Sequence, residues 1–151
     1  MEFKLSRLDR TEWVGMGAAL LLAFSTLLPW FVTDPENPNS KIQGERGIAN
    51  AWEAFDVFQY FLLLCCIAPF VLAWIVVRGH QVGWNRGEVT AIVGALALTG
   101  VLLNGIILGQ PGTVEITPIW GYPVAIFASA VILVAGAMRG AKGRKKQPPG
   151  V

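Results

Sequence analysis

Two carboxylates, Glu53 and Asp56, stand three positions apart in the stretch GIANAWEAFD, just before a long apolar segment. Acidic side chains at this spacing share one face of a helix, where they can serve acid–base chemistry or bind a divalent cation together with Asp34 or Glu36 from the preceding polar segment. A simpler interpretation is that Asn50 caps a helix and Glu53 completes a capping box. That interpretation leaves only Asp56 without a structural role, and we predict no metal site here.

No other group of residues matches a catalytic motif. The one histidine, His80, has no nucleophile or acid beside it in a known arrangement, and the two cysteines, Cys65 and Cys66, are adjacent in the middle of an apolar segment. Cysteines in such a setting are ordinarily small buried residues. We therefore expect a protein that is not an enzyme and that has no catalytic residues and no cofactor.

The composition indicates what kind of chain must position these residues. Of the 151 residues 54% are hydrophobic and 15% are charged, whereas a water-soluble domain carries about 25% charge. The apolar residues are gathered into four segments without Lys or Arg, each long enough to cross a bilayer as a helix. We predict an all-α integral membrane protein, a four-transmembrane-helix bundle with a polar first outer loop. The predicted spans are about residues 13–33, 54–77, 89–108 and 120–138 of a single domain, residues 1–140.

Basic residues predict the orientation of the bundle. All but two of the 12 Lys and Arg residues flank the same side of the predicted spans, and the exceptions, Lys41 and Arg46, lie in the first outer loop. The positive-inside rule then places both termini in the cytoplasm. The basic segment 141–151 is expected to be a disordered tail that contacts anionic lipid. Tryptophans at the span ends fit an interfacial aromatic belt, with Trp30, Trp52 and Trp120 at the outer surface.

Local spacings also predict helix starts and helix packing. Asp9-x-x-Glu12, Asn50-x-x-Glu53 and Asn85-x-x-Glu88 each have the spacing of a capping box. The third span is rich in small residues that let helices approach closely and that favour association in lipid. The predicted packing positions are Gly94, Gly100, Gly105 and Gly109.

Polar residues deep in the predicted spans are few. The candidates are Thr99, Asn104 and Ser129. Asn104 is the most costly to expose to lipid, because its amide has four hydrogen-bonding positions to satisfy. An interhelical hydrogen bond is one interpretation, and a polar path through the bundle is the alternative.

Two short motifs resemble a known pattern. LPWF at residues 28–31 and AWEAFD at residues 51–56 are similar to the LPW(F/Y) … AWEAF pattern of small uncharacterised four-span bacterial membrane proteins. The resemblance implies a bacterial plasma-membrane protein with both termini inside, and it implies no activity. The layout is also similar to that of claudin-like tetraspan proteins, although the paired loop cysteines of that group are missing.

The function predicted from these observations is that of a non-enzymatic interaction, scaffold or self-assembling membrane protein. Its partners would be the lipid bilayer and either a second copy or another membrane protein, and not nucleic acid. The predicted outer interaction surface comprises Pro29, Trp30, Phe31, Trp52, Glu53, Phe55 and Asp56. The alternative is a passive pore or small-solute transporter with a polar path near Asn104.

Overall fold

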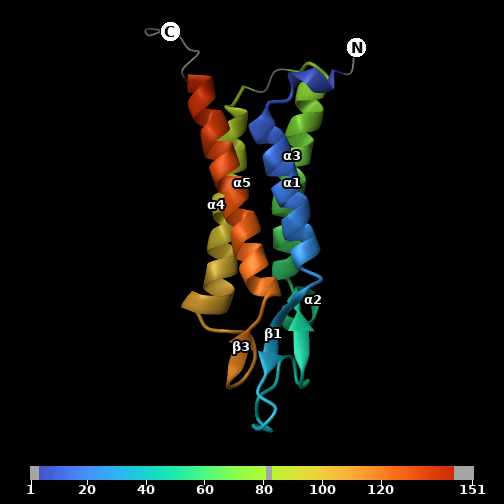
Figure 1. Ribbon diagram of the computed structural model, residues 1–151, viewed down its shortest axis with the longest axis vertical. Helices are drawn as coiled ribbons and strands as arrows, with labels where there is room; N and C mark the ends of the chain where they lie inside the picture. Colours follow the sequence, from blue (N-terminus) through green and yellow to red (C-terminus); the bar gives the residue numbers. More distant parts are fainter. Residues whose placement is uncertain (1–3, 81–82, 145–151) are drawn as a thin grey trace.

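The computed structural model describes residues 4–80 and 83–144, and most of them are helical (Figure 1). Four long helices lie side by side, and a small sheet lies at the end of the bundle away from the start of α1 and the end of α5. The helices are η1 (Leu5–Arg7), α1 (Arg10–Ser25), α2 (Ala51–Ala54), α3 (Phe58–Val77), α4 (Arg86–Leu102) with its π-helical continuation η2 (Leu103–Ile107), and α5 (Gly121–Arg144). The strands are β1 (Pro29–Thr33), β2 (Ile48–Asn50) and β3 (Ile116–Pro118).

Three of the helices are long and apolar enough to cross a membrane. They are α3, the continuous helix Arg86–Ile107 formed by α4 and η2, and α5 over Gly121–Gly143. The structure therefore supports a membrane protein with apolar spanning helices. The prediction of an all-α fold is confirmed in part: the described chain is mostly helical, but a three-stranded sheet joins the helices at one end.

Helix α5 packs most closely on α4 and next on α1. The close approach to α4 depends on glycine, because a Cβ atom at Gly94 would stand 2.7 Å from the Cα atom of Leu133. At Gly100 a Cβ atom would meet the Phe58 ring of α3 at 2.8 Å. Glycine at these positions lets α4 lie directly against its neighbours.

Gly109 differs from the other glycines predicted to pack. Its φ is +91°, and no atom lies close to the position that a side chain would occupy. Gly109 therefore follows the end of η2 in the left-handed conformation that glycine adopts readily, and its assignment to helix packing is wrong.

The first two predicted spans also need correction at their outer ends. The first was expected to run to residue 33, but α1 ends at Ser25 and the chain continues as strand β1. The second was expected from residue 54, but α2 ends at Ala54 and Phe55 is extended, with φ −130° and ψ 151°. Since α3 begins at Phe58, Asp56 lies between two helices and not inside a span.

The sheet has the order β2-β1-β3, and both pairings are antiparallel. In the register Phe31 lies opposite Ala49 of β2 on one side and opposite Pro118 of β3 on the other. Strand β1 is thus the centre of the sheet, and it joins the segment between α1 and α3 to the segment between η2 and α5. We call the sheet, α2 and the connection 34–47 the sheet platform.

Candidate functional site

Four aromatic rings form the base of the sheet platform. Trp30 and Phe31 come from β1, Phe55 follows α2, and Tyr122 lies in the first turn of α5. The Trp30 ring centroid lies 6.2, 6.1 and 5.6 Å from those of Phe31, Phe55 and Tyr122, in edge-to-face geometry each time. Such pairs contribute about 0.5–1.5 kcal/mol beyond the burial of their area. The rings therefore hold the platform on the helix bundle.

Two hydrogen bonds orient these rings. The Trp30 indole N–H donates to the Ser25 carbonyl over 2.7 Å, and the Tyr122 hydroxyl donates to the Val101 carbonyl of α4 over 2.7 Å. A Cβ atom at Gly105 would run into the Tyr122 ring. Glycine at position 105 thus lets Tyr122 lie against the backbone of η2, which ties the sheet end of α4 to the platform.

The predicted outer surface is divided by this arrangement. Trp30 and Phe31 are 0% exposed, so their assignment to an interaction surface, and that of Trp30 to the aromatic belt, is wrong. Partners in the sheet and α5 cover rings that were expected to face a headgroup layer or a partner. Pro29 and Phe55 are half-buried, and the exposed members of the predicted set are Trp52, Glu53 and Asp56. 

Trp52 lies at the border between the platform and the bundle. Its indole N–H donates to the Thr26 hydroxyl over 3.1 Å, and its ring packs edge-to-face on Tyr60 of α3 at 5.3 Å. Both rings are exposed. An indole whose N–H is hydrogen-bonded and whose ring is exposed is typical of the interfacial layer of a membrane.

The two carboxylates of the AWEAFD motif have different surroundings. Asn50 Oδ1 accepts from the backbone N–H of Glu53 over 3.1 Å, and the Glu53 carboxylate accepts from the backbone N–H of Asn50 over 2.9 Å. The predicted capping box is confirmed, and so is the box of Asp9 and Glu12. Asp56 is exposed, and its carboxylate accepts a hydrogen bond from the Gln43 amide over 3.4 Å. Over residues 4–80 and 83–144, no three His, Cys, Asp or Glu side chains form a possible metal site.

The polar connection 34–47 is folded onto the segment between η2 and α5. The Asn37 amide donates to the Glu115 carboxylate over 2.7 Å. The Lys41 backbone N–H donates to the Thr113 hydroxyl, and the Thr113 backbone N–H donates to the Lys41 carbonyl, each over 3.0 Å. Ile42 is buried beneath this crossing. Beside it lies a hollow of about 390 Å³ whose rim carries Gln43, Glu45, Arg46, Ile48 and Glu53. Ile48 is 65% exposed, so charged, amide and aliphatic groups meet on one concave surface.

The predicted intramembrane polar residues do not share a surface. Thr99 is exposed, whereas Ser129 is 0% exposed and donates to the Ala125 carbonyl of its own helix over 2.7 Å. The Asn104 amide donates over 2.9 Å to the Gly100 carbonyl, four residues earlier in the same helix. This bond lies within one helix and is not the interhelical bond that was one of the interpretations.

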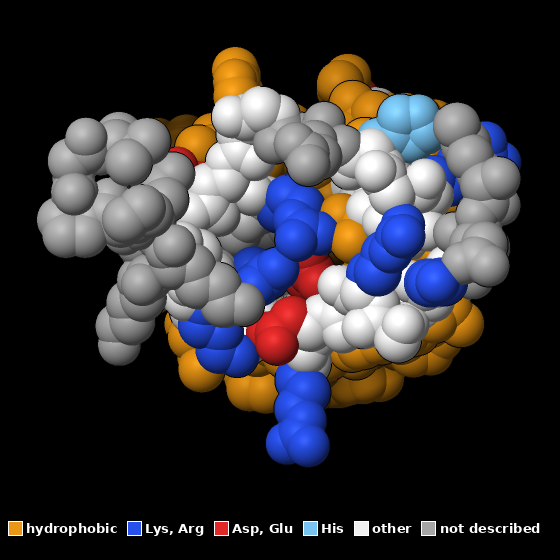
Figure 2. All heavy atoms as spheres, turned by 90° about the horizontal axis from the view of Figure 1, so that it is seen from above, with side chains coloured by type: hydrophobic (Ala, Val, Ile, Leu, Met, Phe, Trp, Pro, Cys, Tyr) orange, Lys and Arg blue, Asp and Glu red, His pale blue; other side chains and the backbone are white. Residues whose placement is uncertain are grey.

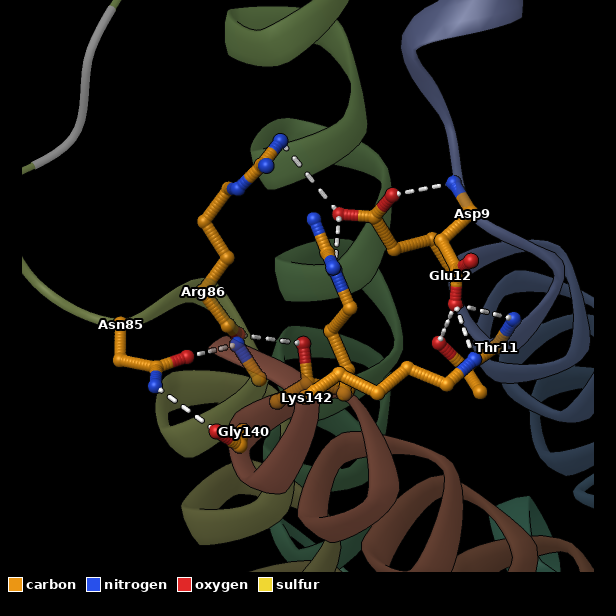
Figure 3. Close-up of polar contacts among 10 residues, drawn as sticks. Asp9, Thr11, Glu12, Asn85, Arg86, Gly140 and Lys142 are labelled. Atoms are coloured by element: carbon orange, nitrogen blue, oxygen red, sulfur yellow. Dashed lines mark hydrogen bonds and ion pairs between the residues drawn. The ribbon is translucent and has the colours of Figure 1, made fainter. Parts of the chain in front are cut away.

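The opposite end of the bundle carries a cluster of ion pairs. Figure 2 shows Lys and Arg side chains gathered at this end with acidic side chains between them. Glu12 Oε1 lies 3.5 Å from the Arg86 guanidinium at the start of α4 and 3.5 Å from that of Arg139 in α5. The Asn85 amide donates to the Gly140 carbonyl over 3.2 Å (Figure 3). One carboxylate on α1 therefore connects both α4 and α5.

Asp9 extends this cluster to the end of α5. Its carboxylate accepts from the Thr11 hydroxyl over 2.6 Å and lies 3.0 Å from the Lys142 ammonium (Figure 3). The Thr11 hydrogen bond and then the Lys142 hydrogen bond hold the pKa of Asp9 well below its ordinary value. Sequence reasoning identified Asp9 and Glu12 as a capping box but not as ion-pair partners. Apart from residues 141–144, the predicted basic tail lies outside the described residues.

Comparison of the chain with protein-family models, with curated proteins and with solved structures finds no match. The function is therefore argued from the chain itself. What its geometry defines is a mostly helical protein with apolar helices able to cross a membrane and with a folded platform at one end.

Proposed function

We propose that the chain is a non-enzymatic, multi-pass bacterial plasma-membrane protein that binds another protein through its sheet platform. In this proposal α1 is a fourth span beside the three long apolar helices. Its 16 residues rise about 24 Å, and a turn lengthens it before β1. Leu20, Phe24 and Leu27 are 57–61% exposed along it, as expected for side chains that face lipid.

The charge distribution supports an orientation with both termini in the cytoplasm. The end that carries the start of α1 and the end of α5 holds Arg10, Arg86, Arg139 and Lys142. Lys and Arg side chains gather at this end (Figure 2). Cytoplasmic segments near spans carry the excess of Lys and Arg. The sheet platform then lies on the outer side of the membrane.

The observation that carries the proposal is that the segment between α1 and α3 and the segment between η2 and α5 fold together into one fixed surface. Hydrogen bonds between residues 37–41 and 113–115 join these segments, and buried aromatic rings hold them on the bundle. A fixed concave surface with Glu45, Arg46 and Ile48 at its rim loses little conformational freedom on binding a partner. Mixed polar and apolar groups are typical of non-obligate protein interfaces.

Self-association through the small-residue faces of α4 has less support than it had from sequence. Gly94 lies against the backbone of Leu133, and a Cβ atom at Gly87 would run into the backbone of Gly140. These faces are therefore used inside the chain by α5. A second copy or a different protein would bind at the platform instead.

Site-specific photocrosslinking in intact cells tests the proposal. A photoreactive residue is placed at Gln43 or Ile48 on the platform, and the matched control is Val71, an exposed residue of α3. We expect one discrete protein adduct at each platform position and none at Val71, and we expect Glu45→Lys to weaken the adduct. No adduct at either platform position, or the same adduct at Val71, would contradict the proposal. Mass determination of the adduct distinguishes a second copy from another protein.

The passive pore predicted as the alternative remains a prediction. It requires solute flux in liposomes that falls when Asn104 becomes Leu. The position of Asn104, bonded within its own helix, does not favour it over the platform proposal.

A further inference from the structure

A groove lies between α1 and α5. It has a volume of about 330 Å³, and apart from Arg10 and Thr11 the residues that line it are apolar. The residues that shape it are Arg10, Val14, Phe127, Ala130, Val134 and Met138. Val14, Phe127, Val134 and Met138 are each more than half exposed, so the groove opens away from the bundle.

The length of the groove corresponds to one leaflet of a bilayer. Residues 127–138 of α5 rise about 16 Å, and half of a hydrocarbon core of about 30 Å is of the same length. Met138 lies near the ion-pair end of α5, and Phe127 lies towards the middle of the helix. An occupant of one leaflet can therefore enter the groove lengthwise from the ion-pair end.

Positive charge at the ion-pair end of the groove selects among such occupants. Arg10, the first residue of α1, is exposed and is one of the residues that line the groove. The nearby acid Asp9 is paired with Lys142, and Glu12 is shared by Arg86 and Arg139, so cations outnumber anions at this end. An anionic headgroup next to a guanidinium gains a charge-assisted hydrogen bond.

We propose that this groove binds one acyl chain of an anionic phospholipid whose phosphate is held by Arg10. Binding needs only that the helices cross a bilayer, and it does not depend on a partner at the sheet platform. The lipid covers the apolar seam between α1 and α5 on the side that faces the membrane. Its headgroup lies at the level of the Asp9–Lys142 pair.

Native mass spectrometry of the detergent-solubilised full chain tests the proposal. The protein is titrated with phosphatidylglycerol and, separately, with phosphatidylcholine. We expect one tightly retained phosphatidylglycerol per chain and weaker retention of phosphatidylcholine. Arg10→Gln should reduce the preference about fivefold, the effect of one basic residue near an anionic lipid surface. Arg78→Gln, at the end of α3 and away from the groove, is the matched control and should keep the preference.

A second variant tests the acyl-chain site itself. Ala130→Trp fills the groove and should abolish the retained lipid whatever its headgroup, whereas Leu64→Trp, on the exposed face of α3, should not. Equal retention in all variants, or equal loss at Leu64, would show only non-specific annular lipid. A dimer in place of the lipid adduct would show that a second copy covers the groove, which also overturns the proposal.

A third measurement needs no substitution, so it applies even where Ala130→Trp does not fold. A phospholipid with a photoreactive group in its acyl chain is incorporated into vesicles with the unmodified protein. We expect labelled peptides that contain residues 10–14 and 127–138. Labelling spread evenly over the exposed faces of α3 and α4 would contradict a defined site.

Discussion

Replacement of Trp30 by alanine should remove the base of the sheet platform. Trp30 is 0% exposed, contacts three other rings and donates a hydrogen bond to the Ser25 carbonyl. Truncation of a buried tryptophan to alanine costs about 3–5 kcal/mol. Trp30→Phe keeps most of the apolar contact and loses a hydrogen bond of about 1 kcal/mol, so its total cost should be about 1–2 kcal/mol. Ser25 keeps one partner in either variant, because its carbonyl also accepts from the Leu28 N–H.

The control for Trp30 is Trp120, which is 58% exposed just before α5. Trp120→Ala should change the free energy of unfolding by only about 0.5 kcal/mol. Unfolding is followed by far-UV circular dichroism as SDS is added to mixed micelles, because tryptophan fluorescence is altered by the substitutions themselves. An aromatic belt would give similar costs at both positions. That outcome, or a Trp30→Ala variant as stable as the wild type, would refute the buried position of Trp30.

Three further predictions concern the helix bundle and its ion pairs. Gly94→Ala should destabilise the fold by about 1–3 kcal/mol, because the new methyl group meets the Leu133 backbone, whereas Gly17→Ala meets no atom and should stabilise α1 by up to about 1 kcal/mol in the same SDS titration. No loss of stability in the Gly94→Ala variant would contradict the close approach of α4 to α5. Glu12→Gln should lower the thermal unfolding temperature in detergent, since it removes the carboxylate that lies between two guanidinium groups. High salt should lower the unfolding temperature of the wild type towards that of the variant. An unfolding temperature that does not depend on salt would argue against these ion pairs. Asp9→Asn keeps an N-cap but loses the charge. Because the folded pKa of Asp9 is depressed, the stability that its carboxylate contributes is present above about pH 4 and is lost as the pH falls through the folded pKa. The stability difference between the variant and the wild type should therefore shrink on acidification, and a difference that stays constant would contradict this prediction.

The helices could be predicted because their signals are local. A long apolar segment without charge predicts a helix able to cross a membrane, and α3, α4 with η2, and α5 are such helices. The box of Asn50 and Glu53 needs only two residues three positions apart, so sequence spacing was sufficient. The same spacing predicted a capping box of Asn85 and Glu88, of which the N-cap is confirmed, because the Asn85 side chain accepts from the Gly87 N–H.

The site depends on contacts that no local pattern contains. The Asp9–Lys142 pair joins residues 133 positions apart, and the Asn37–Glu115 bond joins residues 78 positions apart. The count of basic residues placed Lys142 on the correct side for this pairing, but a count cannot assign one cation to one carboxylate. For the same reason the folded outer connection was expected only as a polar loop.

The segment LPWFVT shows why an apolar run does not identify its own environment. Trp30 and Phe31 were assigned to the first span and to an exposed surface because aromatic residues suit lipid, an interface and a protein core alike. A strand close to a membrane is stable only if its backbone N–H and C=O groups find partners in other strands. Strand β1 has a partner on each side, one from the segment between α1 and α3 and one from the segment between η2 and α5. The choice between a longer helix and a central strand is therefore made by β2 and β3, which no pattern within residues 28–33 can reveal. It follows that deletion of β3 should affect α1 and the first connection together, because the strand that joins them loses one of its two neighbours.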